Sequence, residues 1–400
     1  MKAIIHPGLL KGSIEAIPSK SEAHRLIICA ALATEPTRIL LERTSEDIEA
    51  TLDCIKNIGC AAVKDDLGIT ITPEARAKDL TFDCRESGST LRFMLPIAAA
   101  LFDRSAFKGS GRLPKRPMEP LLDAMEKGGA KFSSRTLPFS VEGKLTPGEY
   151  AIAGNISSQY ITGLLFALSL LKGESVIKLT TRLESRPYVD ITLEAMGKFG
   201  VKPSFDGNSF YISPARYHSP GIVKVGGDWS NAAFFLTAAC LGSKVSVENL
   251  DPSSAQGDKA ILQRLDEFAK NRCINCDISQ TPDMLPILTA AAAMGEGKSV
   301  FTGGARLKTK ESDRLASCEK MINDLGGKAE ADDNSITVWG TGLRGGVVDS
   351  FADHRIVMAA AIAGTVCKED VVIQGAEAVN KSYPGFFEDF IKLGGRADVI

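Results

Sequence analysis

The segment AMEKGGAKF at residues 124–132 shows the pattern that decides the fold. An amphipathic run ends at two glycines, Gly128 and Gly129, and a short strand-like segment follows. Glycine adopts at low cost the left-handed conformation that closes many helices. The pattern therefore predicts a helix that stops at the glycines and leads directly into a strand.

The same pattern recurs along the chain. Further copies are CIKNIGCAAV (54–63), AMGKFGVKP (195–203), MINDLGGKAE (321–330), FIKLGGRADV (390–399) and a weaker one without glycine, LQRLDEFAKNRCINCDI (262–278). Most neighbouring copies end about seventy residues apart, and only the step from Arg272 to Gly327 is shorter. Apolar helices are expected between them, at residues 23–33, 90–101, 158–171, 230–241, 284–294 and 354–365. Six copies of one supersecondary unit are the simplest explanation.

The length and the repeat together predict two domains. A chain of 400 residues is too long for one ordinary core, and three copies would fill each domain. Proline and glycine punctuate residues 214–225, where the join is expected. The strand Lys2–Ile5 precedes the first complete copy and is expected to join the C-terminal half. We therefore expect residues 1–15 together with 222–400 to form one domain, and residues 16–221 to form the other.

Composition limits the classes of partner. A chain that is 44% apolar and 24% charged is typical of soluble globular proteins. A formal charge of −2 gives no general attraction to nucleic acid or to an anionic membrane, so neither partner is expected. No signal peptide or membrane span is recognised. Nine cysteines, an odd number, favour reduced thiols in the cytoplasm, and the CxxC at 273–276 is interpreted as two free thiols. We expect a cytoplasmic monomer.

Five short segments concentrate groups that bind anions. They are PSKSEAHR (18–25), ESGSTLRF (86–93), NISSQY (155–160), KTKESDR (308–314) and FADHRIVM (351–358), most of them at the expected start of a helix. Unsatisfied N–H groups and the positive end of the dipole suit a phosphate there. Simple capping explains any one segment, but recurrence in both halves favours a shared anion site.

Carboxylates accompany the cations in two places. The segment 308–314 mixes Lys310, Glu311 and Arg314, which is typical either of an exposed helical charge run or of a proton-transfer group with a shifted pKa. Asp283 precedes an apolar helix, either as a cap or as a carboxylate that faces a site. Two carboxylates among several cations suit acid–base chemistry on a polyanion.

Other catalytic signatures are missing from the sequence. There is no GxxxxGK[ST], no GxSxG and no HExxH, and GSGRLPKR at 109–116 lacks the spacing of a dinucleotide loop. It is interpreted as a mobile basic loop that carries Arg112, Lys115 and Arg116. We expect no metal and no organic cofactor.

Nine motifs in order resemble those of one family. They are PSKSEAHR, ESGSTLR, LPKRPMEPL, SSQY, ESRPYVDIT, TPDMLPILTAAAA, LKTKESDRL, FADHRIVMA and NKSYPGFF, and together they run from about residue 18 to 390. In this order they resemble the EPSP synthases (3-phosphoshikimate 1-carboxyvinyltransferases). The resemblance implies an α/β (α+β) chain in a two-domain, inside-out α/β barrel-like fold. Each domain would hold three βαβαββ repeats, with the active site in the interdomain cleft.

The resemblance also implies an activity. The family transfers the enolpyruvyl group of phosphoenolpyruvate to the 5-hydroxyl of shikimate 3-phosphate, in aromatic amino-acid biosynthesis. The reaction proceeds by addition and elimination without metal or organic cofactor. Each substrate carries a carboxylate and a phosphate, together roughly five negative charges. The basic residues of the matched motifs would offset that charge despite the net charge of −2.

Site residues follow from the resemblance in three groups. The catalytic group is Lys20, Asp283 and Glu311. The residues expected to bind shikimate 3-phosphate are Lys20, Ser21, Arg25, Ser157, Ser158, Gln159, Ser185, Tyr188, Asp283, Arg306 and Lys310. Those expected to bind phosphoenolpyruvate are Lys20, Gly88, Arg92, Arg116, Gln159, Arg314, Arg355 and Lys381. Asp283 would accept the proton of the attacking hydroxyl, and Glu311 would act on the methylene carbon or the leaving phosphate.

Some positions depart from the family pattern. Glu22-Ala23-His24 stand where many relatives have a serine and an asparagine before the arginine, and ESGST replaces GNAGT or GNSGT. Two alternatives stay open. The sister UDP-N-acetylglucosamine enolpyruvyl transferases carry a reactive cysteine in the loop that matches 109–115, where this chain has none. A non-catalytic anion-binding protein on the same fold would need the cations but neither Asp283 nor Glu311.

Overall fold

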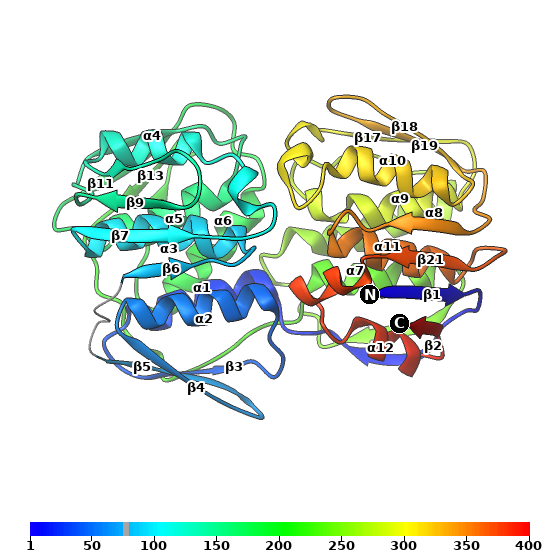
Figure 1. Ribbon diagram of the computed structural model, residues 1–400, viewed down its shortest axis with the longest axis horizontal. Coiled ribbons are helices and arrows are strands. Elements are labelled where there is room, and N and C mark those ends of the chain that lie inside the picture. Colours follow the sequence, from blue (N-terminus) through cyan, green and yellow to red (C-terminus); the bar gives the residue numbers. More distant parts are fainter. Residues whose placement is uncertain (75–79) are drawn as a thin grey trace. The chain divides into compact units, whose positions relative to one another are not determined.

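Four strands and two helices form the repeating element of the fold, as residues 81–142 illustrate (Figure 1). The computed structural model describes residues 1–74 and 80–400. In this repeat, β6 (Thr81–Asp83) runs parallel to β7 (Arg104–Lys108). The hairpin of β8 (Lys131–Phe132) and β9 (Phe139–Glu142) follows, and β9 pairs antiparallel with both β7 and β8. The strand order is β6-β7-β9-β8, with one helix after each of the first two strands.

The same strand order occurs in two more sheets of this half of the chain. One contains β10 (Glu149–Ile152), β11 (Ser175–Leu179), β13 (Ser209–Ile212) and β12 (Ser204–Phe205). The other contains β14 (Ile222–Lys224), β3 (Thr37–Leu40), β5 (Gly68–Pro73) and β4 (Cys60–Asp65). In this last sheet the first strand comes from the far end of the segment, because β14 runs parallel to β3.

The other half of the chain has two complete sheets of this kind. One contains β16 (Asn275–Asp277), β17 (Lys298–Thr302), β19 (Ile336–Trp339) and β18 (Lys328–Ala331). The other contains β20 (Gly346–Asp349), β21 (Val371–Gln374), β1 (Lys2–His6) and β22 (Arg396–Val399). The N-terminal strand therefore completes the C-terminal repeat, by antiparallel pairing with β21 and β22.

One repeat is incomplete. It has two parallel strands, β2 (Lys11–Glu15) and β15 (Lys244–Glu248), with helix α7 (Trp229–Cys240) before β15 and α8 (Ile261–Asn271) after it. Helix α8 leads directly to β16 of the next repeat, so the closing hairpin is missing. This explains the shorter spacing in the sequence and corrects the expectation of six full βαβαββ copies.

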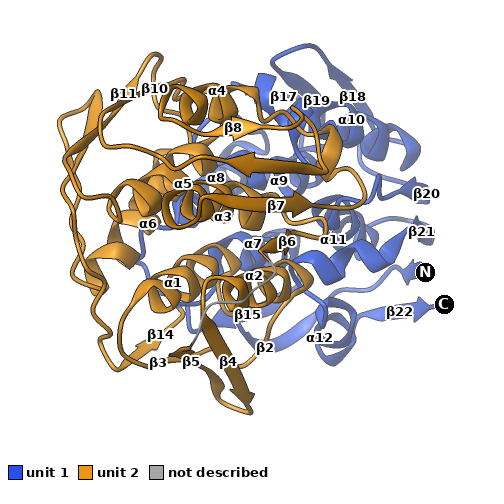
Figure 2. Ribbon diagram, turned by 60° about the vertical axis from the view of Figure 1, so that its left-hand side comes forward, with its two compact units in different colours: residues 1–17, 226–400 blue, residues 18–225 orange. Residues whose placement is uncertain are grey.

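Two compact units result, each with three sheets (Figure 2). Unit 1 comprises residues 1–17 and 226–400, and unit 2 comprises residues 18–225. Residues 222–225, expected in the C-terminal half, lie in unit 2 because β14 joins β3. Residues 16 and 17 lie in unit 1, where the backbone N–H of Ala16 donates to Glu248 and Ile17 accepts from the N–H of Asp228.

The two helices of each repeat differ in burial. The first helices are α1 (Lys20–Leu32), α3 (Gly88–Leu101), α5 (Ser158–Leu168), α7, α9 (Leu285–Ala293) and α11 (His354–Gly364). The second are α2 (Glu46–Asn57), α4 (Glu119–Lys127), α6 (Arg186–Lys198), α8, α10 (Arg314–Asp324) and α12 (Phe386–Lys392). The first helices are buried over most of their length, whereas the second expose one face. This arrangement of buried inner helices is the inside-out barrel expected from the sequence.

Glycines close the second helices in the way the sequence predicted. Gly59, Gly129, Gly200, Gly326 and Gly394 all have positive φ. The weaker copy ends at Arg272, which takes the left-handed conformation itself, with φ 58°.

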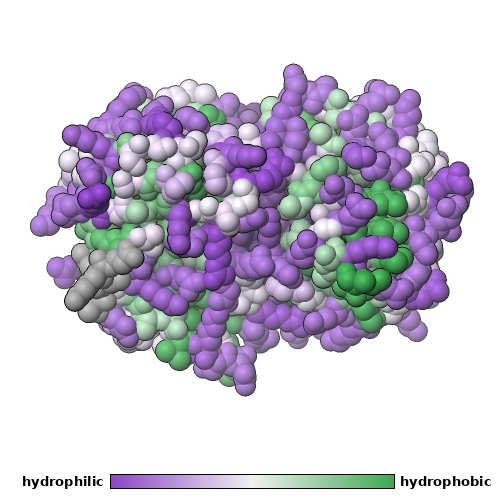
Figure 3. Space-filling model, in the orientation of Figure 1, coloured by the Kyte–Doolittle hydropathy of each residue, from purple (hydrophilic) through white to green (hydrophobic). Residues whose placement is uncertain are grey.

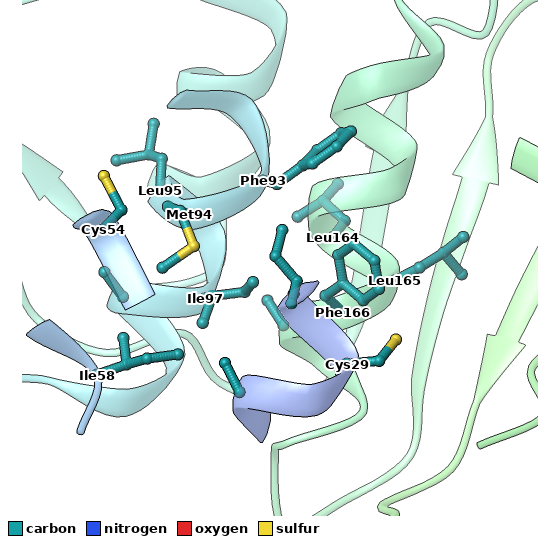
Figure 4. Packing of buried hydrophobic residues seen from close by; sticks show 14 of the residues in the cluster. Cys29, Cys54, Ile58, Phe93, Met94, Leu95, Ile97, Leu164, Leu165 and Phe166 are labelled. Atoms are coloured by element: carbon teal, nitrogen blue, oxygen red, sulfur yellow. The ribbon is translucent and has the colours of Figure 1, made fainter. Parts of the chain in front are cut away.

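Close helix packing forms the core of unit 2 (Figure 4). Phe93 and Met94 of α3 lie with Leu164 and Phe166 of α5 in one buried cluster. A Cβ atom on Gly163 would lie 2.1 Å from the backbone oxygen of Arg92, so only glycine permits this approach of α5 to α3. In the described residues, no helix has both the length and the apolar character needed to cross a membrane. Hydrophilic side chains cover most of the face shown in Figure 3.

Candidate active site

The inner helices of unit 2 begin with neutral caps. Ser19, Ser87 and Ser157 precede α1, α3 and α5, and each side chain accepts a backbone N–H of the first turn. An uncharged cap leaves the positive end of the helix dipole uncompensated, and that end favours an anion. Three motifs that the sequence singled out therefore begin helices that suit a phosphate or carboxylate.

Carboxylates take these positions in unit 1. Asp228 caps α7 and Asp353 caps α11 through their side chains. Asp283 lies in the short 3-10 turn η3 (Pro282–Met284) that leads into α9. Asp283 and Asp353 give the unit 1 cations Arg314 and Arg355 carboxylate partners within the protein.

Lys20 and Arg25 are held at the start of α1. The Lys20 ammonium donates to Asp47 Oδ2 at 3.0 Å, and both side chains are only about 15% exposed. The Arg25 guanidinium donates to the Ser21 and Tyr188 carbonyls at 2.6 and 2.8 Å. Burial lowers the pKa of Arg25 to about 10, partly offset by Tyr188, so the group stays charged at neutral pH. Arg25 thereby joins α1 to α6.

Two guanidinium groups converge on Gly88 at the start of α3. A Cβ atom at Gly88 would lie 2.6 Å from Arg116 Nη1 and 2.9 Å from Arg92 Nη1. Arg92 Nη1 also donates to Gln159 Oε1 at 2.6 Å, and the Gln159 amide donates to Ser89 Oγ at 2.9 Å. The missing side chain of Gly88 therefore leaves room for two cations beside a helix N-terminus. Arg116 follows the 3-10 turn η1 (Leu113–Lys115) in the loop that the sequence marked as basic.

Three of the four candidate serines lie before or at the first residue of α5 and α6. Ser157 and Ser158 begin α5, and Ser185 precedes α6 with its side chain buried. Ser185 has φ 51°, a left-handed conformation that costs a non-glycine residue about 1 kcal/mol or more. Tyr188 lies in the first turn of α6, where its carbonyl accepts from Arg25.

Asp283 is the centre of the charged cluster in unit 1. Its Oδ1 accepts from Arg314 Nη1 at 2.5 Å, and its Oδ2 accepts from Arg355 Nη2 at 2.9 Å. The Lys310 ammonium lies 3.7 Å from Oδ1. Burial acts to raise the pKa of Asp283, but Arg355, Lys310 and Arg314 outweigh it and hold that pKa well below its usual range. The carboxylate is therefore ionised and accepts hydrogen bonds.

Arg314 is enclosed by carboxylates. Besides Asp283, its Nε donates to Asp353 Oδ2 and its Nη2 to Glu311 Oε2, both at 2.8 Å. Its side chain is 1% exposed, and Asp353 is fully buried. Burial acts to lower the pKa of Arg314, but Asp353, Asp283 and Glu311 together raise it well above its usual value. The guanidinium is therefore charged and fixed.

The other cations of unit 1 lie around this cluster. Burial lowers the pKa of Lys310 to about 8, against the opposing effect of Asp283. Arg306 in the turn η4 (Ala305–Thr309) donates from Nη2 to the Ser279 carbonyl at 2.5 Å. Lys381 ends the turn η5 (Ala376–Lys381) and donates to the Ala352 carbonyl at 3.1 Å.

Backbone strain concentrates in the motifs. Phe351 and Ala352, just before Asp353, have φ values of 52° and 54° in succession. Arg85 precedes the ESGST motif with φ 49°, and Ser185 shares this conformation. Such conformations persist where the surrounding structure imposes them, and they are common at active sites. The Ala352 carbonyl that holds Lys381 lies in this strained turn.

The structure brings the sequence candidates together in two groups. Gly88, Arg92, Arg116 and Gln159 meet in unit 2, and Asp283, Lys310, Glu311, Arg314 and Arg355 meet in unit 1. The remaining candidates lie at helix starts or turns within the same units.

Sequence reasoning missed several of their partners. Asp353 could have been found, because it stands at the cap position before Arg355. Asp47 and Thr51 lie inside an ordinary helical segment and give no local signal, whereas Thr90 stands within the motif at residues 86–93. In the described residues, no group of three or more His, Cys, Asp or Glu side chains is placed to hold a metal ion. The thiols of Cys273 and Cys276 are free.

The fold itself belongs to a known class. A solved EPSP synthase from Acinetobacter baumannii has a TM-score of 0.83 and 24% identity, with 99% of each chain covered. An enolpyruvyl transferase from Streptomyces tendae has a TM-score of 0.77 and 17% identity, with 99% and 98% covered. The fold is thus that of the enolpyruvyl transferases.

Sequence comparison then gives the family. The family model of EPSP synthase (3-phosphoshikimate 1-carboxyvinyltransferase) matches residues 5–390. Relatives described as 3-phosphoshikimate 1-carboxyvinyltransferase are 40% identical in Clostridium kluyveri and 41% identical in Clostridium perfringens. The alignments cover 98% of this chain in both cases, and 97% and 98% of the relatives. The chain belongs to the EPSP synthase family.

Proposed function

We propose that this chain transfers the 1-carboxyvinyl group of phosphoenolpyruvate to the 5-hydroxyl of shikimate 3-phosphate and releases phosphate. Membership of the EPSP synthase family is the observation that carries this conclusion. The charged clusters support it, because both substrates are polyanions and the candidate residues supply cations together with ionised carboxylates. The same family match disfavours the two alternatives, which are transfer to UDP-N-acetylglucosamine and a non-catalytic anion-binding protein.

Unit 2 supplies the side chains for the first substrate. We propose that Lys20, Ser21 and Arg25 bind shikimate 3-phosphate at the start of α1. Ser157, Ser158 and Ser185 would hold its phosphate, with Gln159 and Tyr188 beside them. The neutral cap of α5 supports this role, since the first turn of α5 contains no carboxylate to compete with an anion for its N–H groups and dipole.

Two sets of cations are proposed for phosphoenolpyruvate. Arg92 and Arg116 at Gly88, with Gln159, Lys20 and Lys381, are proposed to bind its phosphate. Arg314 and Arg355 are proposed to bind its carboxylate, for which planar guanidinium groups are well shaped.

Proton transfer falls to the unit 1 carboxylates. In the addition step, the 5-hydroxyl oxygen forms a bond to C2 of phosphoenolpyruvate, its proton passes to Asp283, and C3 takes a proton to become a methyl group. In the elimination step, C3 loses a proton, the C2–O bond to phosphate breaks, and phosphate leaves. We propose Glu311 as the group that acts at C3, and Arg306 and Lys310 as cations that orient the acceptor beside Asp283.

The low pKa of Asp283 constrains this role. A carboxylate held strongly in its charged form aligns the hydroxyl well but keeps a proton only briefly. The nearby Lys310, whose pKa is about 8, is partly deprotonated at mildly basic pH. Fixed charges arranged before the substrate arrives cost no reorganisation during the reaction, and this is the main contribution we assign to the cluster.

Phosphate release with each acceptor tests the proposal. The purified protein is incubated with phosphoenolpyruvate and either shikimate 3-phosphate or UDP-N-acetylglucosamine. We expect release only with shikimate 3-phosphate. Release only with the UDP-sugar would assign the chain to the sister activity, and no release with either would favour a non-catalytic binder. We further propose that the protein is a monomer and that it acts in the cytoplasm, and its free cysteines support the second of these statements. Gel filtration checks the monomer.

A further inference from the structure

Two side-chain contacts join helices α1 and α2 in unit 2, one helical turn apart. At the first, Lys20 Nζ of α1 donates to Asp47 Oδ2 of α2 at 3.0 Å. At the second, His24 Nδ1 of α1 lies 2.7 Å from Thr51 Oγ1 of α2. Lys20 and His24 are four residues apart on α1, and Asp47 and Thr51 are four apart on α2. On each helix the two residues therefore lie on the same face. The two contacts thus fix both the distance and the rotation of α1 against α2.

The second contact continues as a chain of hydroxyl groups to α3. Thr51 Oγ1 lies 2.7 Å from Thr90 Oγ1, and Thr90 donates to Ser87 Oγ at 2.8 Å. Ser87 is the cap of α3 and precedes Gly88, where Arg92 and Arg116 converge. His24, Thr51 and Thr90 are all at most 1% exposed, so water does not compete for these bonds.

The direction of the bonds assigns the proton on His24. Because the Thr90 hydroxyl donates to Ser87, its oxygen accepts from Thr51, and Thr51 in turn accepts from the Nδ1–H of His24. The Nε2 atom is buried and has no hydrogen-bond partner in the described residues. Burial, followed by Lys20 and Arg25, holds the pKa of His24 well below its usual value. The ring is therefore neutral and does not repel Lys20.

We propose that His24, Thr51 and Asp47 are positioning residues that fix the Lys20 ammonium relative to the Gly88 turn. The inference rests on the proposed function, in which Lys20 touches both substrates. His24, Thr51 and Asp47 act only through their neighbours, so none of the three needs to touch substrate. A displacement of about 1 Å in a group that contacts both substrates is enough to lower turnover substantially.

The hydrogen bond from Nδ1 of His24 to Thr51 is the contact expected to affect turnover. Asparagine places an amide atom where His24 has Nδ1, and it lacks any atom at the Nε2 position. Leucine has a similar volume but offers no hydrogen bond. His24→Asn should therefore keep the contact with Thr51, whereas His24→Leu should lose it.

Matched threonine variants separate positioning from stability. Thr51→Val removes the hydroxyl that joins the three helices. Thr237→Val is the control, because Thr237 is equally buried in α7 and its hydroxyl donates only to the Ala233 carbonyl of its own helix. Thr51→Val loses two buried hydrogen bonds and Thr237→Val loses one, so both should lower the melting temperature, Thr51→Val by more, and the kinetics are compared well below both melting temperatures.

The test measures kcat and KM for both substrates, together with melting temperature. His24→Leu removes one hydrogen bond of the chain and Thr51→Val removes two, and each should lower kcat/KM by about 3- to 10-fold. The kcat/KM of Thr237→Val should equal that of the wild type, and the kcat/KM of His24→Asn should remain within about 2-fold of it. Asp47→Asn keeps the shape but not the charge and should lower kcat/KM at least as much as Thr51→Val.

Two results would overturn the inference. One is a Thr51→Val protein whose kcat/KM matches that of Thr237→Val. The other is a His24→Asn protein as impaired as His24→Leu. A wild type that fails to use shikimate 3-phosphate would instead defeat the proposed function. An active wild type with unaffected variants would defeat only the positioning role.

Discussion

Replacing Gly88 by alanine should weaken the binding of phosphoenolpyruvate while leaving the fold intact. The new Cβ would lie 2.6 Å from Arg116 Nη1 and 2.9 Å from Arg92 Nη1, whereas ordinary contact begins at 3.4 Å. The two guanidinium groups must therefore withdraw by about 0.8 and 0.5 Å. Both are ends of flexible side chains, and alanine favours a helix by about 1 kcal/mol over glycine, so stability should change little.

The size of the effect follows from the hydrogen bonds at risk. A hydrogen bond to a charged group contributes about 1.5–3 kcal/mol, and each 1.4 kcal/mol is about a factor of ten. Loss of one such bond to the phosphate predicts a KM for phosphoenolpyruvate raised about 10- to 100-fold. The bond exists in both ground and transition state, so kcat should fall much less.

Steady-state kinetics with phosphoenolpyruvate varied at saturating shikimate 3-phosphate measures this effect. Two glycine variants are matched controls. Gly197→Ala in α6 meets nothing within 4 Å and should leave both KM values unchanged. Gly163→Ala would place Cβ 2.1 Å from the Arg92 backbone oxygen and should destabilise the fold. An unchanged KM in Gly88→Ala, or a loss of melting temperature like that of Gly163→Ala, would refute the role assigned to Arg116 and Arg92.

Four further outcomes are expected. Asp283→Asn should lower kcat by about 100-fold or more, measured by phosphate release, and it should also lower the melting temperature, measured by calorimetry, because the buried Arg314 and Arg355 each lose a counter-charge. Lys310 is proposed to bind as a cation, so kcat/KM for shikimate 3-phosphate should fall as the pH rises through about 8, and Lys310→Arg should abolish this fall. Asp353→Asn leaves the buried Arg314 with one counter-charge fewer and should cost about 3 kcal/mol in denaturant unfolding. Two carboxylates raise the pKa of His6 above its usual value, so its stabilisation should be complete below about pH 6.5 and disappear as the pH rises through the folded-state pKa, seen as a pH-dependent difference in melting temperature from His6→Gln.

The repeat could be predicted because its signal is local. A helix that ends at a left-handed glycine requires a similar short sequence pattern each time. The six copies are present in the structure, each with an inner and an outer helix. The missing hairpin after α8 could not be predicted from the pattern, since short strands carry little periodicity. The pairing of β1 with β21 and of β14 with β3 joins segments far apart in sequence, which no local pattern specifies.

Some residues of the candidate site could likewise be predicted from the sequence, and others could not. Motif residues such as Asp283 and Arg314 could be named from the sequence because cations and carboxylates cluster there within a few positions. Asp47 and Thr51 could not, because an acid in the first turn of a helix and a buried threonine are common features without functional meaning. Only the packing of α1, α2 and α3 shows that these residues contact the motifs.

The reaction in deuterated water tests the central claim most directly. The protein is supplied with phosphoenolpyruvate and equal amounts of shikimate 3-phosphate and UDP-N-acetylglucosamine, and the products are weighed by mass spectrometry. We predict an enolpyruvyl adduct of shikimate 3-phosphate alone, with deuterium in its vinyl group, because C3 passes through a methyl group. An adduct of the UDP-sugar alone, or an adduct without deuterium, would contradict it.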